Sequence, residues 1–396
     1  MASTSAPPIN LVEPGLYSHG DPFAQWRWLR ANDPVHWHPP GELPGFWALT
    51  RYADVKDAYL DHETFSSARG ILLRPDEHGA DPGGGRTLAL TDPPRHRMLR
   101  GLVDGWFTVR SVRALEAEMA DIARGVVDRA LEAGGCDFVT DVAARVPLYV
   151  ICRMMGVPEA DWEHLYTLTS QAFAGGDALT RRVAHLEILG YFEQLRKARA
   201  AEPGDDLVSR LATADVEGAP LDPRDVILNC DNLFVGGTEN TRIAAAGGML
   251  AFLRHPDQWR TLVDDPSLLN SAVEEVLRWT STATHIMRTA TRPVTLHGKR
   301  IAAGDRVVFW LPSADRDESV FDDPDRFDVR RRPNRHLALG FGEHFCLGSM
   351  LARVELRLLY RELLTRAPRI ALDSTPKLLD SIVVNGPERL PVTFGR

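Results

Sequence analysis

The segment that most restricts how this chain can fold is residues 223–254, which has the pattern of one uninterrupted helix. Asp222 is a typical N-cap, and Pro223 suits the first helical position. Arg254 in the last turn and Pro256 just beyond it are the expected stop signals. At the usual rise per residue this helix is about 48 Å long, close to the diameter of roughly 55 Å expected for a compact chain of this size. It must therefore run through the interior.

A pair of glycines lies in the middle of this helix. Gly236 and Gly237 each lower helix stability by about 1 kcal/mol relative to alanine, so another group should approach the backbone closely there. Tight packing of a second helix is the simpler explanation, and a bound group is the alternative. The residues that follow are polar, which is unusual in a helix buried in a core: Thr238, Glu239, Asn240 and Thr241.

The rest of the chain has mostly helical patterns, at residues 109–132, 161–174, 180–201, 266–278 and 348–365. Short β patterns occur at 45–50, 294–296, 306–310, 382–384 and 392–394. Because strands and helices do not alternate, we predict a mainly α fold with small β regions and no doubly wound sheet. Residues 66–94 are rich in glycine and proline and are predicted to be a loop over a site. We expect residues 1–396 to form a single domain.

Charge and cysteine usage exclude several classes of protein. The formal net charge of −8 disfavours nucleic acid as the main partner. The N-terminus lacks the pattern of a signal peptide, and no run of about 18 apolar residues occurs, so we expect neither secretion nor a membrane anchor. The four cysteines are widely spaced and form no metal or redox pair motif, which favours a cytoplasmic protein.

A glycine-rich loop at residues 339–348 precedes an amphipathic helix. Its three glycines permit a loop that lies flat against a bulky partner, and Cys346 falls near the helix N-terminus, where an anionic sulfur is favoured. His344 could donate to an anionic group beside the metal. A single thiolate with no second cysteine nearby fits an axial haem ligand better than a zinc site. We therefore predict that Cys346 ligates a haem iron.

This loop resembles the Phe-Gly-x-Gly-x-His-x-Cys-x-Gly motif of the cytochrome P-450 superfamily, soluble bacterial type, with Leu339 at the Phe position. Further motifs in the family's order extend the resemblance over nearly the whole chain. It implies the cytochrome P-450 fold, in which a long central helix crosses the haem. The implied cofactor is haem (heme b, iron protoporphyrin IX), bound through the iron at Cys346.

The resemblance also implies roles for charged residues outside the loop. Those expected to bind the haem propionates are His96, Arg100, Arg288 and His344. Glu275 and Arg278 match the family's Glu-x-x-Arg, and residues 324–327 resemble the segment that supplies the third member of a buried charge network, here Arg326. Removing this network should impair folding and haem retention more than chemistry.

Residues 236–240 resemble the family's proton-delivery motif Ala/Gly-Gly-x-Asp/Glu-Thr, except that Asn240 replaces the threonine. Thr241 is no substitute, because one residue along a helix is about 100° around its axis. An amide is a poor proton relay. Our hypothesis is that Asn240 orients water or a polar substrate group while Glu239 links the site to bulk protons. Alternatively, Asn240 bonds a backbone carbonyl.

The implied reaction inserts one oxygen atom from O2 into a small organic substrate, with electrons from a ferredoxin and its ferredoxin reductase. We expect a secondary-metabolite intermediate, as in antibiotic biosynthesis, either free or bound to a carrier protein. Residues assigned to the oxygen and substrate pocket are Gly236, Gly237, Thr284 and His285. A basic run could dock an acidic ferredoxin or could be a solvated face: Arg326, Arg330, Arg331, Arg332 and Arg335.

Three alternatives stay open. The same fold could catalyse oxidative coupling, dehydrogenation or peroxide-driven oxidation, which Asn240 makes more plausible. The chain could instead be a non-catalytic haem sensor or carrier, in which case substrate would not stimulate turnover of reducing equivalents. A haem-free helical interaction protein would require all of these motifs to be coincidental.

Overall fold

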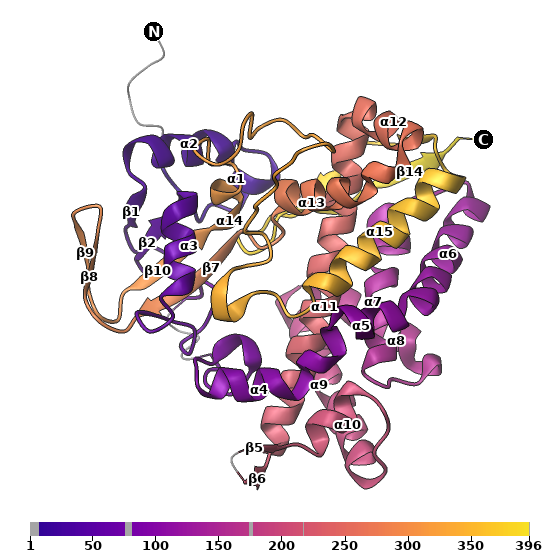
Figure 1. The fold of residues 1–396 in the computed structure, drawn as a ribbon, viewed down its shortest axis with the longest axis horizontal. Coiled ribbons are helices and arrows are strands. Elements are labelled where there is room, and N and C mark those ends of the chain that lie inside the picture. The colour runs from indigo at the N-terminus through magenta and orange to yellow at the C-terminus, as the bar shows by residue number, and fades with distance from the viewer. Residues whose placement is uncertain (1–7, 76–80, 174–176, 217, 396) are drawn as a thin grey trace. The chain divides into compact units, whose positions relative to one another are not determined.

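The computed structural model describes residues 8–75, 81–173, 177–216 and 218–395. The chain divides into two compact units (Figure 1). The first comprises residues up to 84, 246–346 and 376–387, and the second comprises 85–245, 347–375 and the residues from 388 on. The longest helix, α11 (Pro223–Arg254), belongs to both, since the division falls between residues 245 and 246.

The first unit is built on a five-stranded sheet. Its strands, in spatial order, are β1 (Val35–His38), β2 (Phe46–Leu49), β10 (Arg306–Trp310), β7 (His285–Ala290) and β3 (Phe65–Ser66). The β2–β10 pair is parallel and the other pairs are antiparallel.

Both faces of this sheet are covered by helices. Val307 and Phe309 of β10 point into one apolar cluster, which includes residues of α3 (Tyr52–Leu60). Val308 and Trp310 point into a second cluster, with residues of α1 (Gly15–Ser18) and α2 (Pro22–Asn32). This alternation follows from the two-residue period of a strand.

The remaining elements of the first unit follow α11 in the sequence. The helices are α12 (Pro256–Asp264), the 3-10 turn η6 (Pro266–Leu268), α13 (Leu269–Thr280), α14 (Leu311–Ala314) and the 3-10 turn η7 (Gly342–His344). A hairpin is formed by β8 (Val294–Leu296) and β9 (Lys299–Ile301). The strands β12 (Lys377–Leu378) and β13 (Pro387–Arg389) lie where the chain passes from one unit to the other.

The second unit is mostly helical. Its α-helices, besides α11, are α4 (Arg95–Val103), α5 (Val109–Ala114), α6 (Glu116–Ala133), α7 (Arg145–Met154), α8 (Trp162–Phe173), α9 (Ala178–Ala201), α10 (Leu207–Ala212) and α15 (Ser349–Arg366). The helix α6 packs against α7 and α15, and α8 packs along α9 (Figure 1). Short helical segments are η2 (Leu88–Leu90), η3 (Asp104–Phe107), η5 (Glu159–Asp161) and the π-helix η4 (Val139–Ala143).

Small sheets complete the second unit. One has the strand order β11 (Ile370–Leu372), β14 (Pro391–Phe394) and β4 (Gly135–Asp137), and the other pairs β5 (Asp215–Val216) with β6 (Ala219–Pro220). Among the described helices, none is long and apolar enough to span a bilayer.

The mainly α architecture with small β regions is confirmed, and α11 begins and ends at the predicted residues. The helix predicted at 109–132 is divided at Leu115, whose ψ of −5° interrupts the helical path between α5 and α6. The strand predicted at 382–384 is wrong: Val384 forms only an isolated bridge with Ala283. Parts of the predicted loop 66–94 and helix 161–174, namely 76–80 and 174, lie outside the described residues. The single domain stays a prediction.

Candidate functional site

A backbone hydrogen bond made by the cysteine itself closes the glycine-rich loop in the first unit. The backbone N–H of Cys346 donates to the carbonyl oxygen of Leu339 over 2.9 Å. Gly340 and Gly342 have φ values of 71° and 67°, in the left-handed region that side chains disfavour. A Cβ atom on Gly342 would lie 2.9 Å from the carbonyl oxygen of Tyr59. Both glycines are thus required for the turn that presents Cys346.

The third glycine of the motif has a different role. Gly348 has an ordinary φ of −80° and is the N-cap of α15. No described atom lies within 4 Å of the position that its Cβ would occupy. Cys346 is half-buried and precedes this N-cap by two residues. In sequence it is therefore next to the N-terminus of α15, which is the positive end of the helix dipole.

Two cationic side chains predicted to bind propionates belong to the same unit as the cysteine. His344 Nε2 lies 3.1 Å from the hydroxyl of Ser67. Arg288 on β7 is 4% exposed, and its guanidinium carbon lies 5.7 Å from the ring centroid of Tyr59. A thiol, an imidazole and a guanidinium form a donor set whose chemistry fits a sulfur-ligated cofactor that carries carboxylates, as haem does.

Thr284 gives independent support for a non-protein group. Its side chain is fully buried, and its hydroxyl has no hydrogen-bond partner among the described residues. The backbone N–H of Thr284 donates to the carbonyl oxygen of Val383, so this donor is satisfied while the hydroxyl is not. A buried hydroxyl without a partner costs about 1–3 kcal/mol, which a bound group could offset. Thr284 therefore stays a candidate for the predicted pocket.

His285 does not have the role that the sequence suggested. Its Nε2 accepts a hydrogen bond from the backbone N–H of Leu73 over 3.0 Å, which leaves Nδ1 to donate to the carbonyl of Ile382 over 2.9 Å. Burial lowers the pKa of His285 to about 4, so the ring is neutral. The assignment of His285 to a substrate pocket is corrected: both nitrogens are used to join two segments of the core.

The other two predicted propionate ligands lie on α4 in the second unit. His96 and Arg100 are four residues apart and share one helical face. His96 is 1% exposed and Arg100 is half-buried. That these two residues act together with Arg288 and His344 stays a prediction.

The two glycines at the middle of α11 differ in their surroundings. A Cβ atom on Gly237 would lie 3.1 Å from Cγ1 of Ile151 on α7, tighter than most side-chain contacts. Tight helix packing thus accounts for Gly237. Around Gly236, no described atom beyond its chain neighbours and the backbone of its own helix lies within 4 Å of the Cβ position. Gly236 is therefore the one of the pair with space for another group.

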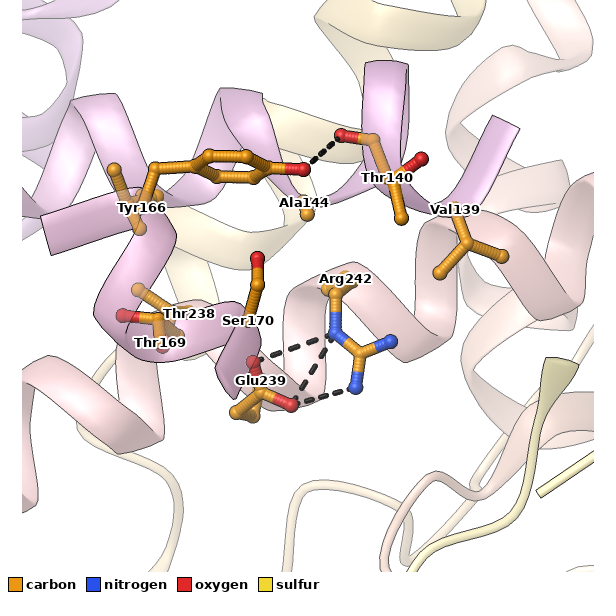
Figure 2. A pocket seen from close by; sticks show the side chains of 10 residues that line it. Val139, Thr140, Ala144, Tyr166, Thr169, Ser170, Thr238, Glu239 and Arg242 are labelled. Atoms are coloured by element: carbon orange, nitrogen blue, oxygen red, sulfur yellow. Dashed lines mark hydrogen bonds and ion pairs between the residues drawn. The ribbon is translucent and has the colours of Figure 1, made fainter. Parts of the chain in front are cut away.

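The polar residues after the glycines have separate partners. The hydroxyl of Thr238 donates to the carbonyl of Phe234 on its own helix over 3.0 Å. Glu239 forms an ion pair with Arg242, with 2.6 Å between Oε2 and Nη2, and Figure 2 shows this pair beside a small cavity. Asn240 is exposed. These contacts explain how a helix through the core tolerates a polar midpoint.

A buried acid that the sequence reasoning missed lies opposite this midpoint. Glu355 on α15 is 2% exposed, and its Oε1 has no hydrogen-bond partner among the described residues. Burial raises the pKa of Glu355 to about 8, against a smaller lowering effect of the nearby Thr241. The sequence did contain a signal, because Leu351, Leu358 and Leu359 lie three or four positions from Glu355 on the apolar face of the helix.

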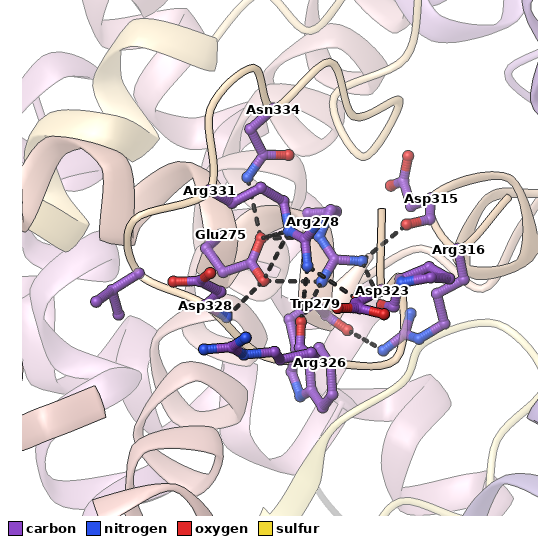
Figure 3. Close-up of polar contacts among 12 residues, drawn as sticks. Glu275, Arg278, Trp279, Asp315, Arg316, Asp323, Arg326, Asp328, Arg331 and Asn334 are labelled. Carbon is purple, nitrogen blue, oxygen red and sulfur yellow. Dashed lines mark hydrogen bonds and ion pairs between the residues drawn. The ribbon is translucent and has the colours of Figure 1, made fainter. Parts of the chain in front are cut away.

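The predicted charge network is present in the first unit (Figure 3). Glu275 and Arg278 on α13 are both fully buried and form two hydrogen bonds of 2.8 Å. Arg278 also donates to the carbonyl oxygens of Asp315 and Pro324. The network thus ties α13 to the segment that leads toward the cysteine loop.

The third side chain of the network is Arg331, which corrects the assignment of Arg326. Arg331 Nε lies 3.2 Å from a carboxylate oxygen of Glu275, and its side chain is 9% exposed. Within the described part of the chain, Arg326 takes part through its carbonyl oxygen alone, which accepts from both Arg278 and Arg331. The backbone turn at Asp323 to Arg326 leaves the Arg326 side chain exposed.

Comparisons with known proteins agree with this site. Residues 261–367, which contain the charge network and the cysteine loop, match the family described as cytochrome P-450. The cytochrome P-450 NovI of Streptomyces niveus is 41% identical over 352 residues, 88% of this chain and 86% of that protein. The steroid C26-monooxygenase of Mycolicibacterium smegmatis is 38% identical over 397 residues, 98% of this chain and 96% of that protein.

A solved structure gives the same result for the fold. The crystal structure of the P-450 OxyD, involved in the biosynthesis of vancomycin-type antibiotics, has a TM-score of 0.91 and 41% sequence identity. The match covers 98% of this chain and 100% of that chain.

Proposed function

The chain belongs to the cytochrome P-450 family, and on that premise we propose that it uses heme b, ligated through Cys346, to oxygenate a secondary-metabolite intermediate. That it is an oxidoreductase of the monooxygenase type follows from the family. The main support for Cys346 as the ligand is the closed loop. Two glycines with positive φ and the Cys346–Leu339 hydrogen bond shape this loop so that it presents one half-buried cysteine. When bound, the haem activates O2.

The chain's own residues would hold the cofactor and supply protons. The residues that would bind the haem propionates are His96, Arg100, Arg288 and His344. The Glu275–Arg278 pair would brace the segment before the cysteine loop. Glu239 would deliver protons, and Asn240 would orient a water or a polar substrate group, because an amide donates and accepts hydrogen bonds but transfers protons poorly.

The ligand assignment is tested by the absorption spectrum of the reduced protein with carbon monoxide, compared with that of Cys346→Ser. We expect a thiolate-type Soret band that the variant loses while its circular dichroism stays helical. Cys152→Ser is a matched control, since Cys152 is a buried thiol on α7 whose pKa burial raises. A haem-free protein, or a Soret band that survives in Cys346→Ser, would contradict the proposal.

The substrate class is supported by the relative whose printed title names a pathway. OxyD takes part in the biosynthesis of vancomycin-type antibiotics, whereas another relative is named for a steroid. We propose a natural-product intermediate, free or bound to a carrier protein. Spectral titration of the oxidised protein with both forms of a candidate compound separates the two, and a steroid that binds more tightly than either would contradict the choice.

A small acidic ferredoxin, itself reduced by a ferredoxin reductase, is the proposed electron donor. Arg331 is used inside the charge network, but the other arginines of the basic run are exposed: Arg326, Arg330, Arg332 and Arg335. Attraction to these residues should weaken as salt screens it. We expect Arg330→Glu to raise the KM for ferredoxin with little change in kcat, whereas a KM that is independent of salt and of this substitution would contradict docking there.

Asn240 favours a second candidate function, oxidative coupling or dehydrogenation of the same substrate class. These reactions place no oxygen in the product, and when a peroxide drives them they do not need the proton delivery that O2 requires, so a poor proton relay would hinder them less. Turnover with isotopically labelled O2 decides between the two, because only the monooxygenase product carries label. A cytoplasmic location is also part of the proposal, since the four cysteines, all in the described part of the chain, form no disulfide. Cell fractionation checks it.

A further inference from the structure

A short segment of chain after β3 lies along β7 in the first unit. β3 pairs with the C-terminal end of β7, and the chain then turns at residues 67–70, where the N–H of Gly70 donates to the carbonyl of Ser67. Beyond this turn, the carbonyl oxygen of Ile71 accepts from the backbone N–H of Met287 on β7 over 2.8 Å. Residues 71–73, here called the edge segment, thus return to the strand that β3 has left.

The side chain of His285 on β7 supplies the next link to the edge segment. The backbone N–H of Leu73 donates to Nε2 of His285 over 3.0 Å, where a regular strand would use a carbonyl oxygen. On the other side of the ring, Nδ1 lies 2.9 Å from the carbonyl oxygen of Ile382. One fully buried side chain therefore joins three separate segments of the first unit.

The two nitrogens of this ring have different roles. The bond from Leu73 needs a lone pair on Nε2, so the ring must be neutral with its proton on Nδ1. Burial lowers the pKa of His285 to about 4 and thereby keeps the ring in this form. Because Nε2 holds the edge segment and Nδ1 holds the segment at Ile382, the two bonds can be removed one at a time.

Thr284, next to His285 on the chain, connects this link with a ligand. Its hydroxyl is buried and has no hydrogen-bond partner among the described residues, although its backbone N–H is bonded to Val383. The edge segment contributes two half-buried apolar side chains, Ile71 and Leu72. A ligand that contacts both features needs an apolar part and a polar group.

We propose that His285 is a positioning residue for substrate specificity: through Nε2 it holds the edge segment beside Thr284 as an apolar wall of the substrate pocket. The inference rests on the proposed function and adds a substrate class to it. The apolar part of the substrate contacts the edge segment, and its polar group bonds the hydroxyl of Thr284. His285 itself touches no substrate.

Two substitutions separate the two bonds of the ring. The amide of His285→Gln reaches the position of Nε2 and can accept from Leu73, but leaves Ile382 without its donor. The amide of His285→Asn lies near the position of Nδ1 and can donate to Ile382, but is too short to reach Leu73. Each variant loses one buried hydrogen bond, so a merely structural role predicts equal effects.

Tyr17→Phe is the matched control. It removes the buried hydrogen bond of 2.8 Å from the Tyr17 hydroxyl to the carbonyl of Leu11. Tyr17 and Leu73 belong to the same apolar cluster, but this bond does not involve the edge segment. The control therefore shows what the loss of one hydrogen bond does to this core in general.

The first readout is hydrogen exchange at the backbone N–H of Leu73 in the substrate-free protein. We expect exchange about tenfold faster in His285→Asn than in wild type, because a factor of ten corresponds to the net contribution of roughly one hydrogen bond. His285→Gln and Tyr17→Phe should exchange at the wild-type rate. This readout needs no activity.

The second readout compares two haem-iron ligands, imidazole and 4-phenylimidazole, by spectral titration of the holoprotein. Imidazole is too small to reach the wall of the pocket, whereas the phenyl ring must pack against it. We expect the ratio of the Kd for 4-phenylimidazole to the Kd for imidazole to rise about tenfold in His285→Asn, the effect of losing roughly 50 Å² of apolar contact. The ratio should stay at the wild-type value in His285→Gln and Tyr17→Phe.

Equal effects of the two His285 variants in either readout would overturn the proposal. Faster exchange in His285→Asn with an unchanged ratio of Kd values would overturn it too, because the edge segment would then be held by His285 without forming a wall of the pocket. If His285→Asn does not fold, His285→Gln still decides, since it must match wild type in both readouts.

Failure of the proposed function has a different signature. In that case the Soret band of the purified protein would be absent or would not respond to imidazole in any variant. Hydrogen exchange at Leu73 is independent of haem, so it would still decide whether Nε2 of His285 holds the edge segment.

Discussion

The buried carboxyl group of Glu355 on α15 faces Thr241 of α11, one residue beyond the exposed Asn240. Oε1 of Glu355 is buried and has no hydrogen-bond partner among the described residues, and such a carboxyl group is stable mainly in its neutral form. Two acids are thus found at this level of the second unit. Glu239, at the midpoint of α11, is ion-paired, whereas Glu355 of α15 is largely protonated.

The free energy of unfolding should depend on pH through the protonation of Glu355. Burial raises its pKa from the ordinary 4.5 to about 8. Between these values the folded state holds one proton more than the unfolded state, so the free energy of unfolding falls as pH rises, by about 1.4 kcal/mol per pH unit. Glu355→Gln should remove this contribution. Urea unfolding across this pH range checks it, with Glu362→Gln on the same helix as the control, and equal slopes in wild type and Glu355→Gln would refute it.

The buried network should matter more for stability than for chemistry. Glu275→Gln leaves Arg278 and Arg331 near a neutral amide in a fully buried position, and breaking such a pair costs about 3–5 kcal/mol. We expect a lower Tm and loss of bound haem on dilution. Arg331→Gln should have a similar but smaller effect. Arg326→Gln is the control, since its side chain is exposed, and a Tm loss there equal to that of Arg331→Gln would contradict the corrected assignment.

Removing the partner of Glu239 should misplace its carboxylate. Arg242→Leu leaves a nearly buried acid unpaired, and an unsatisfied group of this kind costs about 1–3 kcal/mol of stability. We expect a smaller fraction of NADH electrons in product, because Glu239 no longer faces the cavity. Arg242→Lys should restore part of that fraction, since it keeps the charge. A loss of Tm with unchanged coupling would show that the ion pair is only structural.

Asn240 should determine how much product is formed for each NADH consumed. If it orients a water or a substrate group, Asn240→Ala lowers the yield of product per NADH, whereas Asn240→Thr supplies the hydroxyl that the family motif has at this position. We expect the threonine variant to raise the yield of oxygenated product. Measuring NADH, O2 and product together checks both variants. Identical yields in wild type and Asn240→Ala would show that the amide has no part in the reaction.

The sequence by itself determined the elements whose signals are local. The ends of α11 follow from Asp222, Pro223 and Pro256, which satisfy or prevent backbone hydrogen bonds within a single turn. The turn before Cys346 follows from Gly340 and Gly342, because few other residues adopt a positive φ. Such features need no information about distant parts of the chain.

Only the tertiary structure decided which side chains meet across distant segments. Arg331 rather than Arg326 reaches Glu275, although both are arginines in the same basic run. His285 uses both ring nitrogens on backbone groups of two other segments. Gly237 packs on α7 while Gly236 does not. The physical reason is common to all three: hydrogen bonds and contacts depend on orientation and distance in space, and neighbouring residues of similar chemistry differ in where the folded backbone points them.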